Sequence, residues 1–258
     1  MYSSDTPRPR VVVYDLGLQG WQVAILNSLK SAGIFTELRK FDYSKYPEFW
    51  NIKVNKGEYG WKVGILSEIV QDFPGIIVWL DSGSLMKTSF LRNIERLLVN
   101  DRCIASPTSS GSFFQWTHPG IYAYYGESKP EKFRHINNCS SGVLVFNTHT
   151  AMELLKKWLD CALHKDCIAP PGSSRKNHRQ DQAALTYISA REGCFFSKTP
   201  AQFRVINHMD RVCAENIVRY EQLNSVPWKI SENDRLRMKK FKGRRKGNWW
   251  DLVWEVEA

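Results

Sequence analysis

The segment that decides the fold reads Ile76-Ile77-Val78-Trp79-Leu80-Asp81-Ser82-Gly83. Its first five residues are a continuous apolar run, which is typical of a parallel strand covered on both faces. Pro74-Gly75 precedes the run and the polar residues from Asp81 follow it, so both ends of the strand are marked by turn-forming residues. The segment predicts a buried strand that presents Asp81 and Gly83 at its carboxyl end.

Strand and helix patterns alternate on both sides of this segment. Runs rich in β-branched and other apolar residues predict strands, and apolar residues at helical spacing predict helices. The predicted strands are 11–14, 35–41, 76–80, 103–106 and 143–146, and the predicted helices are 21–32, 59–73, 89–98, 151–163 and 181–191. This alternation favours an α/β fold, a single Rossmann-like domain with a mostly parallel central sheet flanked by helices.

The predicted domain covers residues 1–228 and is followed by a basic tail, 229–258. The chain has 258 residues and a formal net charge of +10, and eight Lys and Arg lie between Arg235 and Gly247 with no acidic residue among them. Such a tail suits an anionic membrane surface or a phosphate group, and a solvated surface tail without a partner is the alternative. Nucleic acid is the alternative partner, which rests on the tail and Trp249-Trp250 alone, and we do not expect it.

The composition excludes two classes of protein. The hydrophobic residues make up 43% of the chain, which is too much for a disordered protein. No apolar stretch approaches the roughly 20 residues that span a bilayer. A membrane anchor, if the protein has one, is therefore expected outside this sequence.

Six cysteines leave the redox compartment open at this stage. Cys161 and Cys167 are close enough in sequence to close a short loop, whereas no Cys/His cluster has the spacing of a zinc site. We expect a compartment of the secretory pathway, the Golgi lumen, where disulfides form. Asn138 begins an N-glycosylation pattern but also opens an apolar run, so we expect it to be too buried for modification.

Polar residues at the ends of predicted strands are the first candidates for a ligand site, since ligands of open α/β sheets bind at the carboxyl ends of the strands. Three places qualify. Tyr14 and Asp15 lead into a turn at Gly17, Asp81 leads into Gly83, and the polar stretch 137–142 precedes the strand at 143–146. Each motif alone is weak, because Asp and Gly also end strands for reasons of turn geometry.

The order of the motifs along the chain resembles the GT-A glycosyltransferases, of the glycogenin and galactosyltransferase type, and an uncharacterised animal family of similar proteins. The resemblance covers roughly residues 11–210. It rests on Trp79-Leu80-Asp81-Ser82-Gly83, then Asn138-Cys139-Ser140-Ser141-Gly142-Val143-Leu144-Val145-Phe146-Asn147, then Arg179-Gln180-Asp181-Gln182, then Asn207-His208. It implies a GT-A-like domain that transfers a hexose from a nucleotide-sugar, a UDP-sugar, to a glycan or glycoprotein acceptor.

By this resemblance, Asp81 and His208 hold a divalent metal beside the donor diphosphate. Carboxylate oxygen and imidazole suit Mn²⁺, and carboxylate oxygen suits Mg²⁺. The family has a second aspartate where this chain has Gly83. One carboxylate fewer weakens metal binding, so either Asp210 supplies the missing oxygen or fixed cations replace the metal.

The resemblance also assigns roles to the remaining candidates. Lys62 is similar to a basic residue that contacts the donor phosphates, with an exposed lysine on an amphipathic helix as the alternative. Asn138 and Ser140, with Ser141, would bind the sugar or acceptor through hydrogen bonds. Asp181 and Gln182 are the implied catalytic residues near the anomeric carbon. The alternative for this pair is that Asp181 caps a helix and Gln182 is exposed.

Aromatic side chains in predicted loops are candidates for stacking on a saccharide. Trp50 follows the second predicted strand, and Trp116 and Tyr122 belong to the Gly-, Ser- and aromatic-rich stretch 107–132. That stretch is long for a connection without secondary structure, which is typical of a substrate loop. Aromatic residues that merely cover the edge of a core are the alternative.

Two other functions compete with glycosyl transfer. The turn from Asp15 to Gly20 resembles the cofactor turn of adenosylmethionine-dependent methyltransferases, and Asp42 is placed to hold a ribose. That hypothesis leaves the motifs at 138–147 and 181–182 unexplained. The third possibility is an inactive relative that binds a glycan or an anionic surface, which Gly83 favours.

Overall fold

The computed structural model describes residues 9–98, 102–206 and 232–233. These residues fall into two compact units: residues 9–42 with 232–233 belong to the first, and residues 43–206 to the second. The predicted boundary at residue 228 and the basic stretch 235–247 lie outside the described residues. Each unit is described by itself.

The first unit contains a β-α-β arrangement. Strand β1 (Val12–Asp15) leads into helix α1 (Gly20–Ser31), and β2 (Glu37–Lys40) then pairs with β1 in parallel, with Val12 opposite Glu37. Gly33 has a φ of 71° and follows the helix, as expected of a residue that ends one. The prediction of a strand, a helix and a second strand is confirmed here.

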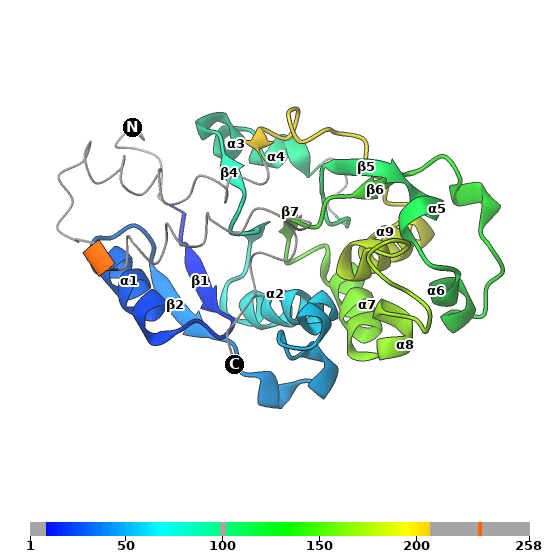
Figure 1. Ribbon diagram of the computed structural model, residues 1–258. Helices are drawn as coiled ribbons and strands as arrows, with labels where there is room; N and C mark the ends of the chain where they lie inside the picture. The colour runs from blue at the N-terminus through cyan, green and yellow to red at the C-terminus, as the bar shows by residue number, and fades with distance from the viewer. Residues whose placement is uncertain (1–8, 99–101, 207–231, 234–258) are drawn as a thin grey trace. The chain divides into compact units, whose positions relative to one another are not determined.

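The second unit is mixed α/β and holds the remaining elements (Figure 1). Its strands are β3 (Ile76–Leu80), β4 (Leu85–Met86), β5 (Thr108–Ser112), β6 (Asn137–Cys139), β7 (Val143–Asn147) and β8 (Val205–Ile206). Its α-helices are α2 (Gly60–Asp72), α3 (Thr88–Arg92), α4 (Ile94–Leu97), α5 (Phe113–Trp116), α6 (Pro119–Tyr124), α7 (Met152–Leu163), α8 (Lys165–Ile168) and α9 (Gln180–Arg191). Short 3₁₀ helices are η1 (Tyr43–Lys45), η2 (Glu48–Trp50), η3 (Asn55–Tyr59) and η4 (Glu131–Phe133).

The deciding strand β3 pairs in the opposite direction from the one predicted. It runs antiparallel to β7, with Ile76 opposite Asn147 and Leu80 opposite Val143. Beyond one end of the ladder, Thr148 N–H donates to Gly75 O at 2.9 Å, and beyond the other, Asp81 N–H donates to Gly142 O at 2.8 Å. Among the described strands β1–β2 is the parallel pair, and β4–β8 and β5–β6 are also antiparallel. An apolar run predicts burial but not direction, so the mostly parallel sheet is not what these residues form.

Three further segments differ from the prediction. The expected helix at 89–98 is divided into α3 and α4 at Asn93, whose side-chain amide donates to Ser89 O at 2.7 Å. The expected strand at 103–106 is reduced to a single bridge between Ala105 and Val145. The long stretch 107–132 is not structureless, because it holds β5, α5 and α6 and enters η4.

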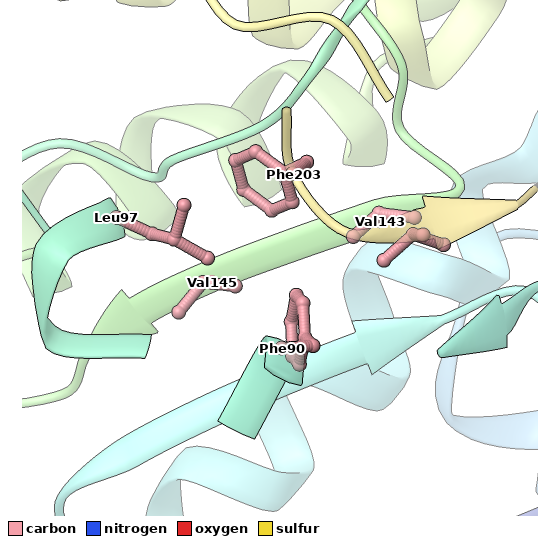
Figure 2. Close-up of a cluster of buried hydrophobic side chains, with 6 residues drawn as sticks. Phe90, Leu97, Val143, Val145 and Phe203 are labelled. Carbon is pink, nitrogen blue, oxygen red and sulfur yellow. The ribbon is translucent and has the colours of Figure 1, made fainter. Parts of the chain in front are cut away.

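One hydrophobic cluster packs on a face of β7 (Figure 2). Val143 and Val145 point into it from the strand and meet Phe90, Leu97 and Phe203. The intervening residues of the strand, Leu144 and Phe146, are fully buried as well. Both faces of β7 are therefore covered, and this explains why its sequence is apolar at every position from 143 to 146.

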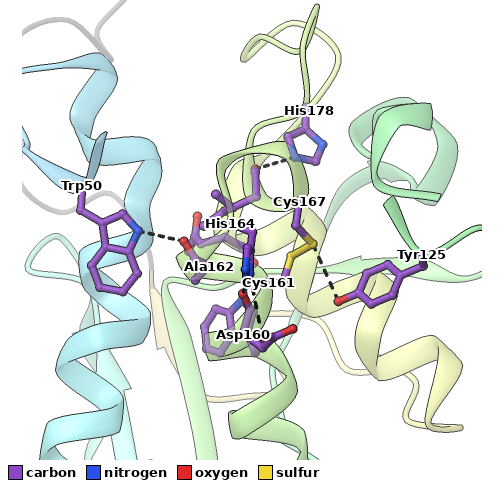
Figure 3. Close-up of a disulfide and its surroundings, with 11 residues drawn as sticks. Trp50, Tyr125, Asp160, Cys161, Ala162, His164, Cys167 and His178 are labelled. Atoms are coloured by element: carbon purple, nitrogen blue, oxygen red, sulfur yellow. Dashed lines mark hydrogen bonds and ion pairs between the residues drawn. A yellow bond between two sulfur atoms is a disulfide. The ribbon is translucent and has the colours of Figure 1, made fainter. Parts of the chain in front are cut away.

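Helices α7, α8 and α9 lie side by side, and α2 packs on α7 (Figure 1). Trp50 is wholly buried, and its indole N–H donates to Ala162 O at the end of α7, at 2.8 Å (Figure 3). A Cβ on Gly60 would lie 2.2 Å from the same indole nitrogen. The glycine in α2 thus leaves the space that Trp50 fills. No helix in the described part of the chain is long and apolar enough to cross a membrane.

Two disulfides cross-link the second unit. Cys103 is bonded to Cys194, and Cys161, close enough in sequence to Cys167 to close a short loop, is bonded to it (Figure 3). Cys139 is a buried free thiol, and burial raises its pKa to about 12. The fully buried Asn138 agrees with the expectation that the glycosylation pattern is inaccessible.

Removing the bond between Cys161 and Cys167 is expected to lower the free energy of unfolding by about 2 kcal/mol, because it closes a short loop. The two cysteines are six residues apart in sequence. The double variant Cys161→Ala and Cys167→Ala, with the other disulfide intact, tests this by urea denaturation. An unchanged unfolding midpoint would mean that the bond does not constrain the unfolded chain.

Candidate active site

Lys62 is the centre of the candidate site. It lies in the first turn of α2 and is 2% exposed, so the alternative of an exposed surface lysine is wrong. A buried ammonium is costly unless opposite charge and hydrogen-bond acceptors surround it. Lys62 has both.

Two carboxylates and one serine surround the Lys62 ammonium. Its Nζ lies 2.9 Å from Asp181 Oδ2 and 3.2 Å from Asp81 Oδ1. It also donates to Ser141 O at 3.2 Å and to Ser141 Oγ at 3.3 Å. Burial lowers the pKa of Lys62, but the charges of Asp181 and Asp81 outweigh burial and hold the pKa above its ordinary value. We call Lys62, Asp81, Ser141 and Asp181 the Lys62 cluster.

Backbone contacts join the segments that carry the cluster. Asp81 follows β3, Ser141 precedes β7, and the two strands are hydrogen-bonded along their length. The bond from Asp81 N–H to Gly142 O continues their ladder into the site. A Cβ on Gly142 would lie 3.2 Å from Asp81 Oδ2, so a glycine lets the carboxylate approach the loop closely. The packing of β3, β7, α2 and α9 therefore brings together side chains that are up to 119 positions apart in the sequence.

Asp181 is the buried carboxylate of the cluster. It is 4% exposed and lies in the first turn of α9, where the N-cap residue is Arg179. The alternative that Asp181 caps the helix is therefore wrong. Its Oδ2 accepts no hydrogen bond from the described residues, so the 2.9 Å ion pair with Lys62 is the interaction that compensates its burial. Trp158 donates to the backbone oxygen of Asp181 at 3.1 Å.

Asp81 is the carboxylate of the cluster that solvent reaches, with a side chain 47% exposed. Its Oδ1 accepts from the Trp79 indole N–H at 2.7 Å and faces Lys62. Its Oδ2 has no hydrogen bond or ion pair within the described part of the chain. Trp79 was not among the predicted site residues, although its place two positions before Asp81 puts both side chains on one side of the strand.

The other predicted residues of this unit lie near the same segments. Gln182 is half-buried and donates from Nε2 to Ser109 Oγ at 3.1 Å. Asn138 donates from Nδ2 to Ser112 O at 2.6 Å, and its buried Oδ1 accepts no hydrogen bond from a described residue. The Ser140 backbone N–H donates to Pro107 O at 2.7 Å and to Ser106 Oγ at 3.0 Å. Gly83 lies in the turn after Asp81 and is partly exposed.

A strained segment enters α2 just before Lys62, and sequence reasoning missed it. Residues 55–59 all have left-handed φ values, from 45° at Glu58 to 63° at Gly57, and Gln180, the first residue of α9, has a φ of 36°. Gln180 Nε2 lies 3.4 Å from Glu58 Oε2, and burial raises the pKa of Glu58. Backbone in this region is costly for residues other than glycine and is often found at functional sites. The only signal in the sequence is Gly57.

The predicted cofactor-binding residues Tyr14, Asp15 and Gly17 belong to the first unit. Asp15 is buried, and its Oδ1 accepts from the N–H groups of Gly17 at 2.8 Å and Leu18 at 2.6 Å. Gly17 has a φ of 124°, a conformation that favours glycine. The carboxylate thus shapes the turn between β1 and α1, where a βαβ unit of this kind can receive a nucleotide.

The residues that the structure describes do not form a metal site. No group of three His, Cys, Asp or Glu side chains among them is placed to hold an ion. Oδ1 of Asp81 is occupied by Lys62 and Trp79, and Gly83 supplies no side-chain oxygen. His208 and Asp210 lie outside the described residues, so their metal-binding role stays a prediction.

The expected stacking faces are mostly buried. Trp50 is 0% and Tyr122 2% exposed, so neither offers a ring to a saccharide and both predictions are wrong. Trp116 is partly exposed, with the Arg179 guanidinium 4.0 Å from its ring centroid. Trp50 instead stacks on Tyr46, and Tyr122 packs against Phe113 and Tyr187.

No protein-family model matches the chain, and no curated protein matches it either. The geometry of the Lys62 cluster is therefore the basis for a function.

Proposed function

We propose that the chain is a glycosyltransferase that moves a hexose from a nucleotide-sugar donor, a UDP-sugar, to a glycan or protein acceptor. The observation that carries this proposal is the convergence of three segments on Lys62. Asp81, the 138–142 loop and the start of α9 are far apart in sequence, and they belong to three of the four motifs on which the resemblance to GT-A enzymes rests. If these motifs act together in catalysis, their side chains must lie in one site, as those around Lys62 do.

The charge of the cluster suits the sugar better than the diphosphate. One ammonium faces two carboxylates, so its positive charge is more than balanced. In glycosyl transfer the bond from the anomeric carbon to the diphosphate oxygen breaks, the acceptor hydroxyl oxygen bonds to that carbon and releases its proton, and positive charge develops on the sugar. We infer that Asp81, the exposed carboxylate, faces this charge, and that Lys62 and the buried Asp181 position it.

Negative charge develops on the leaving diphosphate and needs a cation beside it. Lys62 is buried between carboxylates, so we assign this role to other groups. We propose that this cation is either Mn²⁺ or Mg²⁺ bound with the help of His208, or the Lys and Arg side chains of the basic tail. The two disulfides support a secretory compartment, the Golgi lumen, as the place of action.

A donor screen tests the proposed function. The full chain is incubated with UDP- and GDP-sugars, with and without Mn²⁺, and the release of nucleoside diphosphate is followed by mass spectrometry. We expect turnover of at least one nucleotide-sugar. Binding of adenosylmethionine with no binding of any nucleotide-sugar would instead support the methyltransferase alternative, for which the β1-α1-β2 unit is equally suited. Binding of a nucleotide-sugar without turnover would indicate an inactive relative.

A further inference from the structure

Two arginines lie beside the Lys62 cluster, in the loop that leads into α9. Arg175 and Arg179 are half-buried, and Arg179 is two positions before Asp181. The Arg175 guanidinium lies 5.1 Å from the centroid of the Tyr59 ring, and the Lys62 ammonium lies 6.0 Å from the same centroid. One aromatic ring therefore contacts both the cluster and this loop.

Charge also couples the two arginines to the cluster and to each other. Burial raises the pKa of Tyr59, and both the charge of Arg175 and the charged groups of the Lys62 cluster act on the same ring hydroxyl. Burial lowers the pKa of Arg179, and the positive charge of Arg175 lowers it further. The two guanidinium groups thus lie close enough to repel each other, and an anion beside them would relieve that repulsion.

Trp116 holds Arg179 in place. The Arg179 backbone N–H donates to Trp116 O at 3.1 Å, and the Arg179 guanidinium lies 4.0 Å from the centroid of the Trp116 ring. Trp116 is itself fixed, because its indole N–H donates to Ser110 O at 2.9 Å. A guanidinium stacked on a ring presents its N–H groups in one plane, which is the geometry that pairs with two phosphate oxygens.

Strained backbone lies directly beside both aromatic contacts. Tyr59 has a φ of 59°, and Gln180, the residue after Arg179, has a φ of 36°. The two strained segments meet where Gln180 Nε2 lies 3.4 Å from Glu58 Oε2. Such strain persists where the surrounding structure fixes the backbone, and it is often found at ligand sites. We infer that it serves here to place Tyr59 and Arg179 next to the cluster.

We propose that Arg175 and Arg179 bind the diphosphate of the nucleotide-sugar donor, an inference that rests on the proposed glycosyltransferase function. In such a donor the sugar is bonded directly to the diphosphate, so the groups that contact these two parts must be neighbours. The Lys62 cluster has two carboxylates for one ammonium and faces the sugar, and the two arginines face the phosphates. As the donor bond breaks, its electron pair stays on the diphosphate oxygen, where the guanidinium groups stabilise the charge. The metal ion or the basic tail adds the remaining positive charge.

Binding of UDP, inorganic pyrophosphate and uridine to the full chain tests this role without any turnover. Each probe is titrated by calorimetry, once with Mn²⁺ and once with a chelator in its place. Arg175→Gln and Arg179→Gln are each expected to weaken the binding of UDP and pyrophosphate about tenfold or more in both conditions, the loss of charge-assisted hydrogen bonds. Uridine has no phosphate, so its binding should not change. Equal losses for UDP and uridine would overturn the proposal, because they would show that the variants disturb the fold and not a phosphate contact.

Arg191→Gln is the matched control, the same change at the other end of α9. Arg191 is the last residue of that helix, roughly 16 Å from its start at 1.5 Å per residue. Its guanidinium also lies over a ring, 4.5 Å from the Tyr125 centroid. This variant should bind UDP and pyrophosphate as the wild type does.

The outcomes separate this proposal from the proposed function. If the chain turns over a nucleotide-sugar while Arg175→Gln and Arg179→Gln bind UDP as the wild type does, the arginine assignment is wrong and the transferase function stands. If the arginine variants lose pyrophosphate binding but the wild type neither binds nor turns over any nucleotide-sugar, the diphosphate site is supported and the transferase function is wrong. A wild type that binds neither UDP nor pyrophosphate would overturn the site itself.

Discussion

Replacing Lys62 with methionine is expected to lower the free energy of unfolding by about 3–5 kcal/mol, the cost of leaving a buried charge without its partner. Methionine preserves the length of the side chain but removes the ammonium that both carboxylates face. Asp181 is 4% exposed and is left with no compensating charge, whereas solvent partly compensates Asp81. Most of the loss therefore comes from Asp181. Urea denaturation of the two proteins measures it.

A surface ion pair serves as the control for this prediction. Lys156 lies 2.8 Å from Glu153 on α7, and both side chains are exposed, so Lys156→Met should leave stability unchanged. The contribution of Lys62 to the free energy of unfolding should also depend on pH. The pKa of Lys62 is raised in the folded chain, so this stabilisation is complete below about pH 10.4 and is lost as the pH rises through the folded-state pKa. A Lys62→Met variant as stable as the wild type would show that the cluster does not hold α2, β3 and α9 together.

Local sequence predicted the elements around the site better than their pairing. The apolar runs at 76–80 and 143–146 are strands, and the helical spacing after Gly60, Ala151 and Gln180 gives α2, α7 and α9. The direction in which β3 and β7 pair depends on how the chain returns between them, through β5, α5, α6 and β6. Apolar runs carry no information on that path, and the described strands do not confirm a mostly parallel central sheet.

The burial of individual side chains is the other property that local sequence patterns do not predict. Lys62 and Trp50 were both predicted to face a ligand, and both are buried. Their burial depends on α2, where Gly60 and Gly64 make room for Trp50, and on carboxylates that come from distant segments. The spacing of Asp81 and Asp181 in sequence does not reveal that one ammonium lies between them. Only the ordered set of motifs pointed to a common site.

Asp81→Asn is expected to reduce donor turnover by about 10²–10³-fold while the protein remains folded. The substitution removes charge but little volume, and the asparagine Oδ1 can still accept the hydrogen bond from Trp79. Lys62 keeps the closer of its two carboxylates, that of Asp181 at 2.9 Å. Turnover is measured with the donor found in the screen, and folding is measured by thermal melting in the same buffer.

Comparison with Asp181→Asn separates catalysis from support of the fold. Asp181 is buried and Asp81 is half-exposed, so Asp181→Asn should lower the melting temperature more than Asp81→Asn does. Asp160→Asn, the same change at an exposed aspartate, should alter neither turnover nor melting. If Asp81→Asn keeps full turnover and only lowers the melting temperature, then Asp81 supports the fold as Asp181 does. The exposed carboxylate would then have no part in the chemistry, and the assignment of the sugar to the Lys62 cluster would be wrong.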